Sequence, residues 1–197
     1  LEIEEAKAEA YAEQEPGADM VIEEAAAESN EGCKPAKKAK APRAYRKTMA
    51  GYKKSEVIMD RLGANSHEYF ALELADAELS QEELKAKQEE MLARIDGIAK
   101  KIGEKAVNLL SWLAGRAKLS NYTEQALRLL IEKGKITSKD LLEHYKARPY
   151  SEGTSRSQSQ QLMKLLPEMK VGIMDGKVMH LNPESLIVAK FREQIEG

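Results

Sequence analysis

Residues 121–181 read NYTEQALRLLIEKGKITSKDLLEHYKARPYSEGTSRSQSQQLMKLLPEMKVGIMDGKVMHL, and this stretch decides the fold. It begins with three patterns in which apolar residues recur three or four positions apart, the spacing of one helix face. Gly134 ends the first pattern, Ser138 is a suitable N-cap for the second, and the third covers 155–169. The apolar positions of these three expected helices are Ala126, Leu129, Leu130, Ile131, Leu141, Leu142, Tyr145, Leu162, Leu165, Leu166 and Met169.

Two apolar runs follow the third pattern. Residues 171–174 and 177–181 flank the dipeptide Asp175-Gly176. An Asp-Gly pair between apolar runs is a strong hairpin signal, because both turn residues must adopt a positive φ. The sequence therefore predicts a two-stranded β-hairpin whose tip is Asp175-Gly176.

Three helices followed by a hairpin resemble the winged helix-turn-helix superfamily. The matching segments are Ile136-Thr137-Ser138 before the second helix, Ser155-Arg156-Ser157-Gln158 at the start of the third, and the Asp175-Gly176 turn as the wing. The resemblance covers residues 121–181. It implies a double-stranded DNA-binding domain in most such proteins, and a protein-binding domain in a minority.

The resemblance also implies which residues meet DNA. The third helix would lie in the major groove, where Arg pairs with guanine, Gln pairs with adenine and Ser bonds either base. The expected base-reading residues are Ser155, Arg156, Ser157, Gln158 and Gln161, with Gln160 of the same suitable type. Contacts to phosphate position the protein without reading sequence. Their candidates are Lys135, Lys139, Arg148, Lys164, Lys170 and Lys177.

Four features leave the alternatives open. No acid occurs between Thr154 and Pro167, which favours an anionic partner over a merely solvated Ser/Gln face. In contrast, an acidic wing tip at Asp175 and a net charge of only +3 over residues 122–182 suit a docking domain that binds protein. The segment 146–153 is also longer than a usual helix-two to helix-three turn.

The N-terminal quarter separates its charges. Residues 1–31 hold eleven acids and one lysine, and such a composition predicts a disordered tail. The tail either solvates the chain, competes with DNA or recruits a basic protein partner. Residues 32–48 hold no acid and form a basic arm, which can neutralise phosphates without sequence preference. The cations of this arm are Lys34, Lys37, Lys38, Lys40, Arg43, Arg46 and Lys47.

Between the arm and the C-terminal unit, residues 52–117 predict helices. Ser80 and Glu83 form a capping-box pattern before a long apolar stripe. Gly97 and Gly103 interrupt this stripe, so two helices with a bend are expected. The stripe either packs inside one subunit or forms a homodimer interface. Its candidate dimerisation residues are Met91, Ile95, Ile98, Ile102, Leu109 and Leu113.

Several other classes of function have no support in the sequence. Cys33 is the only cysteine, and the three histidines have no partner at metal-ligand spacing, so we expect no metal, no cofactor and no enzymatic activity. His180 is expected to pack on the hairpin face. No run reaches the roughly 20 apolar residues of a membrane span. We expect a cytoplasmic, nucleoid-associated protein, or a nuclear one in a eukaryotic host.

The sequence as a whole predicts a mainly α protein with three regions. These are a disordered tail at 1–48, a helical region at 52–117 and a winged-helix domain at 119–197. The expected function is double-stranded DNA binding by a transcriptional regulator or a plasmid or phage accessory factor. The alternative is a docking subunit of a larger assembly with no sequence-specific readout of DNA.

Overall fold

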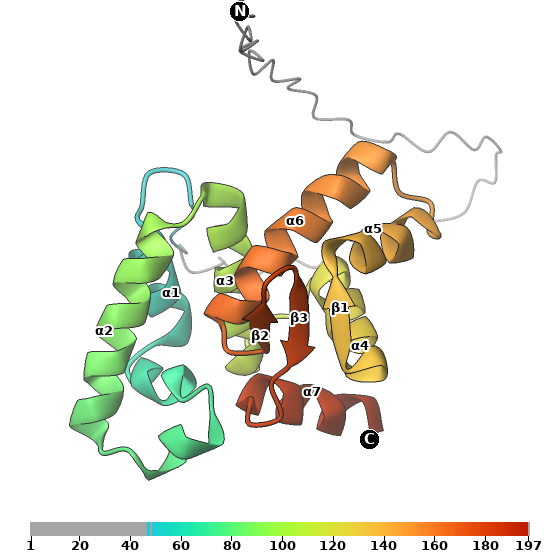
Figure 1. Ribbon diagram of the computed structural model, residues 1–197. Coiled ribbons are helices and arrows are strands. Elements are labelled where there is room, and N and C mark those ends of the chain that lie inside the picture. The colour runs from blue at the N-terminus through green and yellow to red at the C-terminus, as the bar shows by residue number, and fades with distance from the viewer. Residues whose placement is uncertain (1–46, 48, 197) are drawn as a thin grey trace, which may run out of the picture. The chain divides into compact units, whose positions relative to one another are not determined.

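The computed structural model describes residues 47 and 49–196, and this part of the chain is mainly helical, as predicted (Figure 1). The expected disordered tail and the basic arm, apart from Lys47, lie outside the described residues. Two short 3₁₀ helices, Ser66–Phe70 and Leu74–Glu78, separate the first two α-helices. The other elements are α1 (Lys54–Leu62), α2 (Gln81–Gly97), α3 (Lys100–Leu113), α4 (Asn121–Lys133), β1 (Lys135–Thr137), α5 (Ser138–Lys146), α6 (Glu152–Glu168), β2 (Gly172–Asp175), β3 (Val178–Leu181) and α7 (Leu186–Glu196).

The hairpin belongs to a small antiparallel sheet in the order β1-β3-β2. Strand β1 was not predicted, because three residues are too few to show an alternating pattern. Its central residue, Ile136, is buried and pairs with Met179, whereas its neighbour Lys135 is exposed. Thr137 then caps α5 by a capping box with Asp140, so the N-cap is one residue earlier than expected.

The tip of the hairpin differs from the prediction by one residue. Asp175 pairs with Val178 across the two strands, so Gly176 and Lys177 are the two turn residues. Gly176 has φ 58°, while Lys177 is not among the residues with positive φ. A glycine at the first turn position with negative φ at the second fits a type II′ turn, which needs only one positive φ. The tip therefore carries Lys177, and Asp175 ends strand β2.

The central helices and the C-terminal helices share one hydrophobic core. The predicted bend is confirmed at Gly97, since α2 ends there and α3 begins at Lys100, whereas Gly103 lies inside α3 and does not interrupt it. Helix α3 packs against both α1 and α6. The proposed dimerisation stripe is consequently used within one chain: Ile98 is half-buried, and the other positions are buried, namely Met91, Ile95, Ile102, Leu109 and Leu113. Packing inside one subunit therefore accounts for this stripe, and homodimerisation through it stays a prediction.

Helix α7 closes the core from the C-terminal end and was not predicted. Ile187, Val188 and Phe191 are buried. The ring of Phe191 meets Trp112 of α3 edge-on, with ring centroids 6.1 Å apart. The Trp112 indole N–H also donates to Gln194 Oε1 at 2.9 Å. The C-terminal helix α7 thus packs on the last turn of α3 and holds it in place.

Candidate functional site

Helix α6 presents one polar face and buries the other. Its N-cap is Ser151, whose hydroxyl accepts from the Thr154 amide, so the helix starts three residues earlier than predicted. Leu162, Leu165 and Leu166 are fully buried against the core. On the opposite side the exposed residues recur three or four positions apart; they are Gly153, Arg156, Gln160 and Lys164, and the exposed acid Glu152 precedes them. We call these four residues the outer face of α6.

The predicted base-reading residues divide between the two sides of α6. Arg156 is exposed, and Ser157 and Gln161 are half-buried at the edge, where the Gln161 amide donates to Ser157 Oγ at 2.9 Å. Ser155 is 0% exposed and points into the core, which corrects its assignment as a base-reading residue. Gln158 is half-buried, and its side-chain oxygen is enclosed without a hydrogen-bond partner among the described residues.

Gln160 lies on the outer face, although the sequence interpretation gave it no separate role. The signal was present, because a rotation of 100° per residue places Arg156, Gln160 and Lys164 on one side and Ser155 on the other. The assignment of Ser155 and Gln158 treated four consecutive residues as one surface. Consecutive residues on a helix point in different directions, so such a run cannot form one contact surface.

If the chain binds duplex DNA as the sequence predicts, replacing Ser155 with alanine should leave the affinity unchanged. The Ser155 hydroxyl is buried and has no hydrogen-bond partner within the described chain. An unpaired buried polar group costs about 1–3 kcal/mol, so its removal should keep or raise the free energy of unfolding. Chemical denaturation and a duplex DNA titration of Ser155→Ala test this. A loss of affinity with unchanged stability would restore Ser155 as a contact residue.

The residues predicted to contact phosphate also differ in whether a carboxylate of the same chain already pairs with them. Lys139 has Glu143 at 3.8 Å, and Lys170 has Glu73 at 3.7 Å. The remaining four candidates have no carboxylate of the described chain within 4.0 Å; these are Lys135, Arg148, Lys164 and Lys177. Arg148 instead bonds to His144 Nε2 at 2.7 Å. Burial, and to a smaller extent the positive charge of Arg148, lowers the pKa of His144.

One acid lies at the start of α6. Glu152 is in the first helical turn, 3.4 Å from Arg156 and 3.8 Å from Lys146. All three side chains are largely exposed, so these ion pairs are weak and exchange readily with other partners. The acid-free part of the helix is therefore its middle, around Gln160 and Lys164.

The β2–β3 hairpin lies beside the C-terminal half of α6 (Figure 1). Met174 of β2 faces Met163, Lys164 and Pro167 of α6 across a shallow pocket of about 410 Å³. On the exposed side of the sheet His180 pairs in register with both Lys135 and Ile173. The prediction of a packed His180 is wrong, since this side chain is exposed.

Helix α5 packs against α6. Tyr145 of α5 is 0% exposed, and its hydroxyl donates to the backbone oxygen of Tyr122 in α4 at 2.7 Å. Burial, with smaller effects from Tyr150 and Tyr122, raises the pKa of Tyr145, so the hydroxyl stays protonated and keeps this bond at any physiological pH. A rigid support of this kind holds the outer face of α6 in a fixed direction.

Other types of site find no counterpart in residues 47 and 49–196. Within them, no three His, Cys, Asp or Glu side chains come together as a metal would require. No described helix combines the length and the apolar character needed to cross a membrane. No protein-family model, curated protein or solved structure matches the chain.

Proposed function

We propose that the chain binds double-stranded DNA, with α6 in the major groove and the β2–β3 hairpin as the wing beside it. The observation that carries this proposal is the outer face of α6. It offers Arg156, Gln160 and Lys164, which suit guanine, adenine and phosphate, on a helix whose inner face is fully buried.

The hairpin supports this proposal. Lys177 occupies the turn itself, so the tip of the wing carries a cation beside the exposed Asp175. Lys164 lines the shallow pocket between α6 and the wing. No carboxylate of the described chain lies within 4.0 Å of it, and Glu168, which lines the same pocket, pairs with Arg94. Lys177 and Lys164 would contact phosphates on either side of the groove, while the basic arm would add affinity without sequence preference. The biological role that fits is a regulator of transcription or a plasmid or phage accessory factor.

A second candidate function rests on the apolar side chains of the wing. Ile173 is 57% exposed and Met174 is 41% exposed on the edge strand β2. Exposed apolar residues on an edge strand suit a protein partner that pairs with the strand. In that case the domain would dock into an assembly, and α6 would make no sequence-specific contact.

Selection from a random duplex pool with the full-length protein tests the proposal. The wild type should enrich a defined sequence, and Gln160→Ala should bind it with about 1–3 kcal/mol less free energy, roughly 5- to 150-fold weaker. The preference should relax at one base pair only. Gln81→Ala is the matched control, because Gln81 is an exposed glutamine at the start of α2. An unselective wild type, or equal loss in both variants, would leave docking as the better function.

A further inference from the structure

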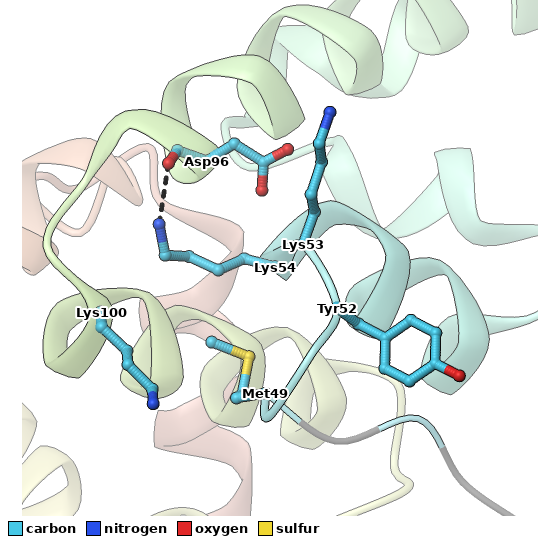
Figure 2. Close-up of a pocket in the computed structure, with 6 residues that line it drawn as sticks. All are labelled: Met49, Tyr52, Lys53, Lys54, Asp96 and Lys100. Carbon is cyan, nitrogen blue, oxygen red and sulfur yellow. Dashed lines mark hydrogen bonds between the residues drawn. The ribbon is translucent and has the colours of Figure 1, made fainter.

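A pocket of about 360 Å³ lies where the chain enters the folded unit (Figure 2). Its walls come from residues 49–54 and from the junction between α2 and α3. The lining residues are Met49, Tyr52, Lys53, Lys54, Asp96 and Lys100. Three lysines therefore face one carboxylate, which leaves a net charge of +2 around the pocket.

Lys54 and Asp96 hold the pocket together. The Lys54 ammonium donates to the backbone oxygens of Asp96 and Ile98 at 2.8 and 2.7 Å. The Asp96 carboxylate accepts from the Ser55 amide at 2.9 Å and from the Ser55 hydroxyl at 2.6 Å. Burial alone would raise the pKa of Asp96. The hydrogen bonds from Ser55 and the nearby charges of Lys54 and Lys53 together have the larger effect, so the pKa lies below its ordinary value. Both groups thus have structural partners already.

Lys53 and Lys100 are the two remaining charges. Both are exposed, and neither has a carboxylate oxygen of the described residues within 4.0 Å, although the charge of Lys53 acts on Asp96 from a longer distance. Figure 2 shows them on opposite sides of the Lys54–Asp96 pair, extending in different directions. Two separated ammonium groups suit an elongated polyanion with one charge beside each lysine better than a single small anion. Tyr52, which is 37% exposed, lines the same pocket.

The basic arm ends at this pocket. Lys47 is the last of its seven cations, and the Lys47 amide donates to Asp60 Oδ2 of α1 at 3.1 Å. The Lys47 ammonium lies 5.3 Å from the centre of the Tyr52 ring. The basic sequence therefore continues from the arm to Lys53 without an intervening acid, because residues 48–55 contain none, and the fold brings Lys100 of α3 to the same pocket.

From this continuity we propose that Lys53 and Lys100 bind phosphates of a nucleic-acid backbone as it passes from the basic arm onto the folded unit. This second contact surface is separate from the outer face of α6, and it deepens the proposed function, on which it rests. Contacts of this kind add affinity that falls with salt and carry no base preference. Tyr52 supplies an aromatic ring beside the two cations. Proteins that bind single-stranded nucleic acids combine such rings, on which bases stack, with cations that contact the backbone.

The first test compares full-length Lys53→Gln/Lys100→Gln with the charge-matched control Lys85→Gln/Arg192→Gln, which changes exposed residues of α2 and α7. Neutralising two phosphate contacts should reduce the slope of log affinity against log salt by about 1.8 for duplex DNA. The selected sequence should not change, since α6 is intact. The control should keep the wild-type slope. An unchanged slope in the first variant, with the sequence preference still dependent on Gln160, overturns the pocket proposal alone.

Lysine acetylation footprinting, read by mass spectrometry, tests the pocket independently of α6. Duplex DNA or oligothymidylate should each protect Lys53 and Lys100, but not Lys85. Protection by oligothymidylate without any selected duplex would support the pocket and reject major-groove reading. Protection by phosphatidylserine vesicles and by neither nucleic acid would overturn the proposal in favour of a lipid surface. No protection by any of these probes would also overturn it.

Discussion

Replacing Phe191 with alanine is expected to lower the free energy of unfolding by about 3–5 kcal/mol, the usual cost of deleting a buried phenyl ring. Phe191 is 2% exposed and packs edge-on against Trp112, so its removal leaves a cavity beside the last turn of α3. Because Trp112 is the only tryptophan, its fluorescence reports unfolding directly. Denaturant titration of the full-length variant gives the measurement.

The matched control is Ile195→Ala on the same helix. Ile195 is 40% exposed, so this truncation should change the free energy of unfolding by less than about 1 kcal/mol. The difference between the two variants separates core packing from a general effect on α7. Equal, small effects at both positions would mean that α7 does not close the core.

Raising salt from about 50 to 200 mM is expected to weaken duplex binding by about a thousandfold or more. The estimate assumes that at least six cations of the arm and the folded unit each neutralise one phosphate. Replacing Lys34, Lys37, Lys38, Lys40 and Arg43 with glutamine should then lower the salt slope by about 4.5, or about 0.9 per charge. Fluorescence anisotropy at several salt concentrations measures both slopes.

A charge-conserving control replaces each of the four lysines with arginine and Arg43 with lysine, so all five positive charges stay. Its slope should equal that of the wild type, because phosphate neutralisation depends on charge rather than on side-chain shape. If the glutamine variant also retains the full slope, the arm makes no phosphate contact. The salt dependence would then come from the folded unit alone.

The sequence was most informative where patterns were long. Apolar residues at helical spacing predicted α4, α5 and α6, and the Gly97 interruption predicted the break between α2 and α3. The 17-residue α6 also carried the information that separates Ser155 from Gln160, although that separation was seen only in the folded chain. A rotation of 100° per residue along a helix is enough to place Ser155 and Gln160 on different sides.

Other features depend on tertiary contacts that the local sequence does not contain. Strand β1 has three residues and exists because Ile136 pairs with Met179, more than forty positions later. Helix α7 had a partial signal, since Ile187, Val188 and Phe191 share one helix face, but its role became visible only from its contact with Trp112. The apolar stripe of α2 and α3 could not reveal whether its partner was another chain or the same one.

The shared core has a consequence for modularity. Helix α3 contacts both α1 and α6, and Trp112 is covered by α7, so the segment 121–181 has no separate core to carry into another protein. Recombination that transfers this segment alone would expose apolar surface, whereas transfer of residues 47–196 would keep one cooperative unit. Substitutions in α1 or α3 can therefore alter the pose of α6 from a distance, without any change on its outer face.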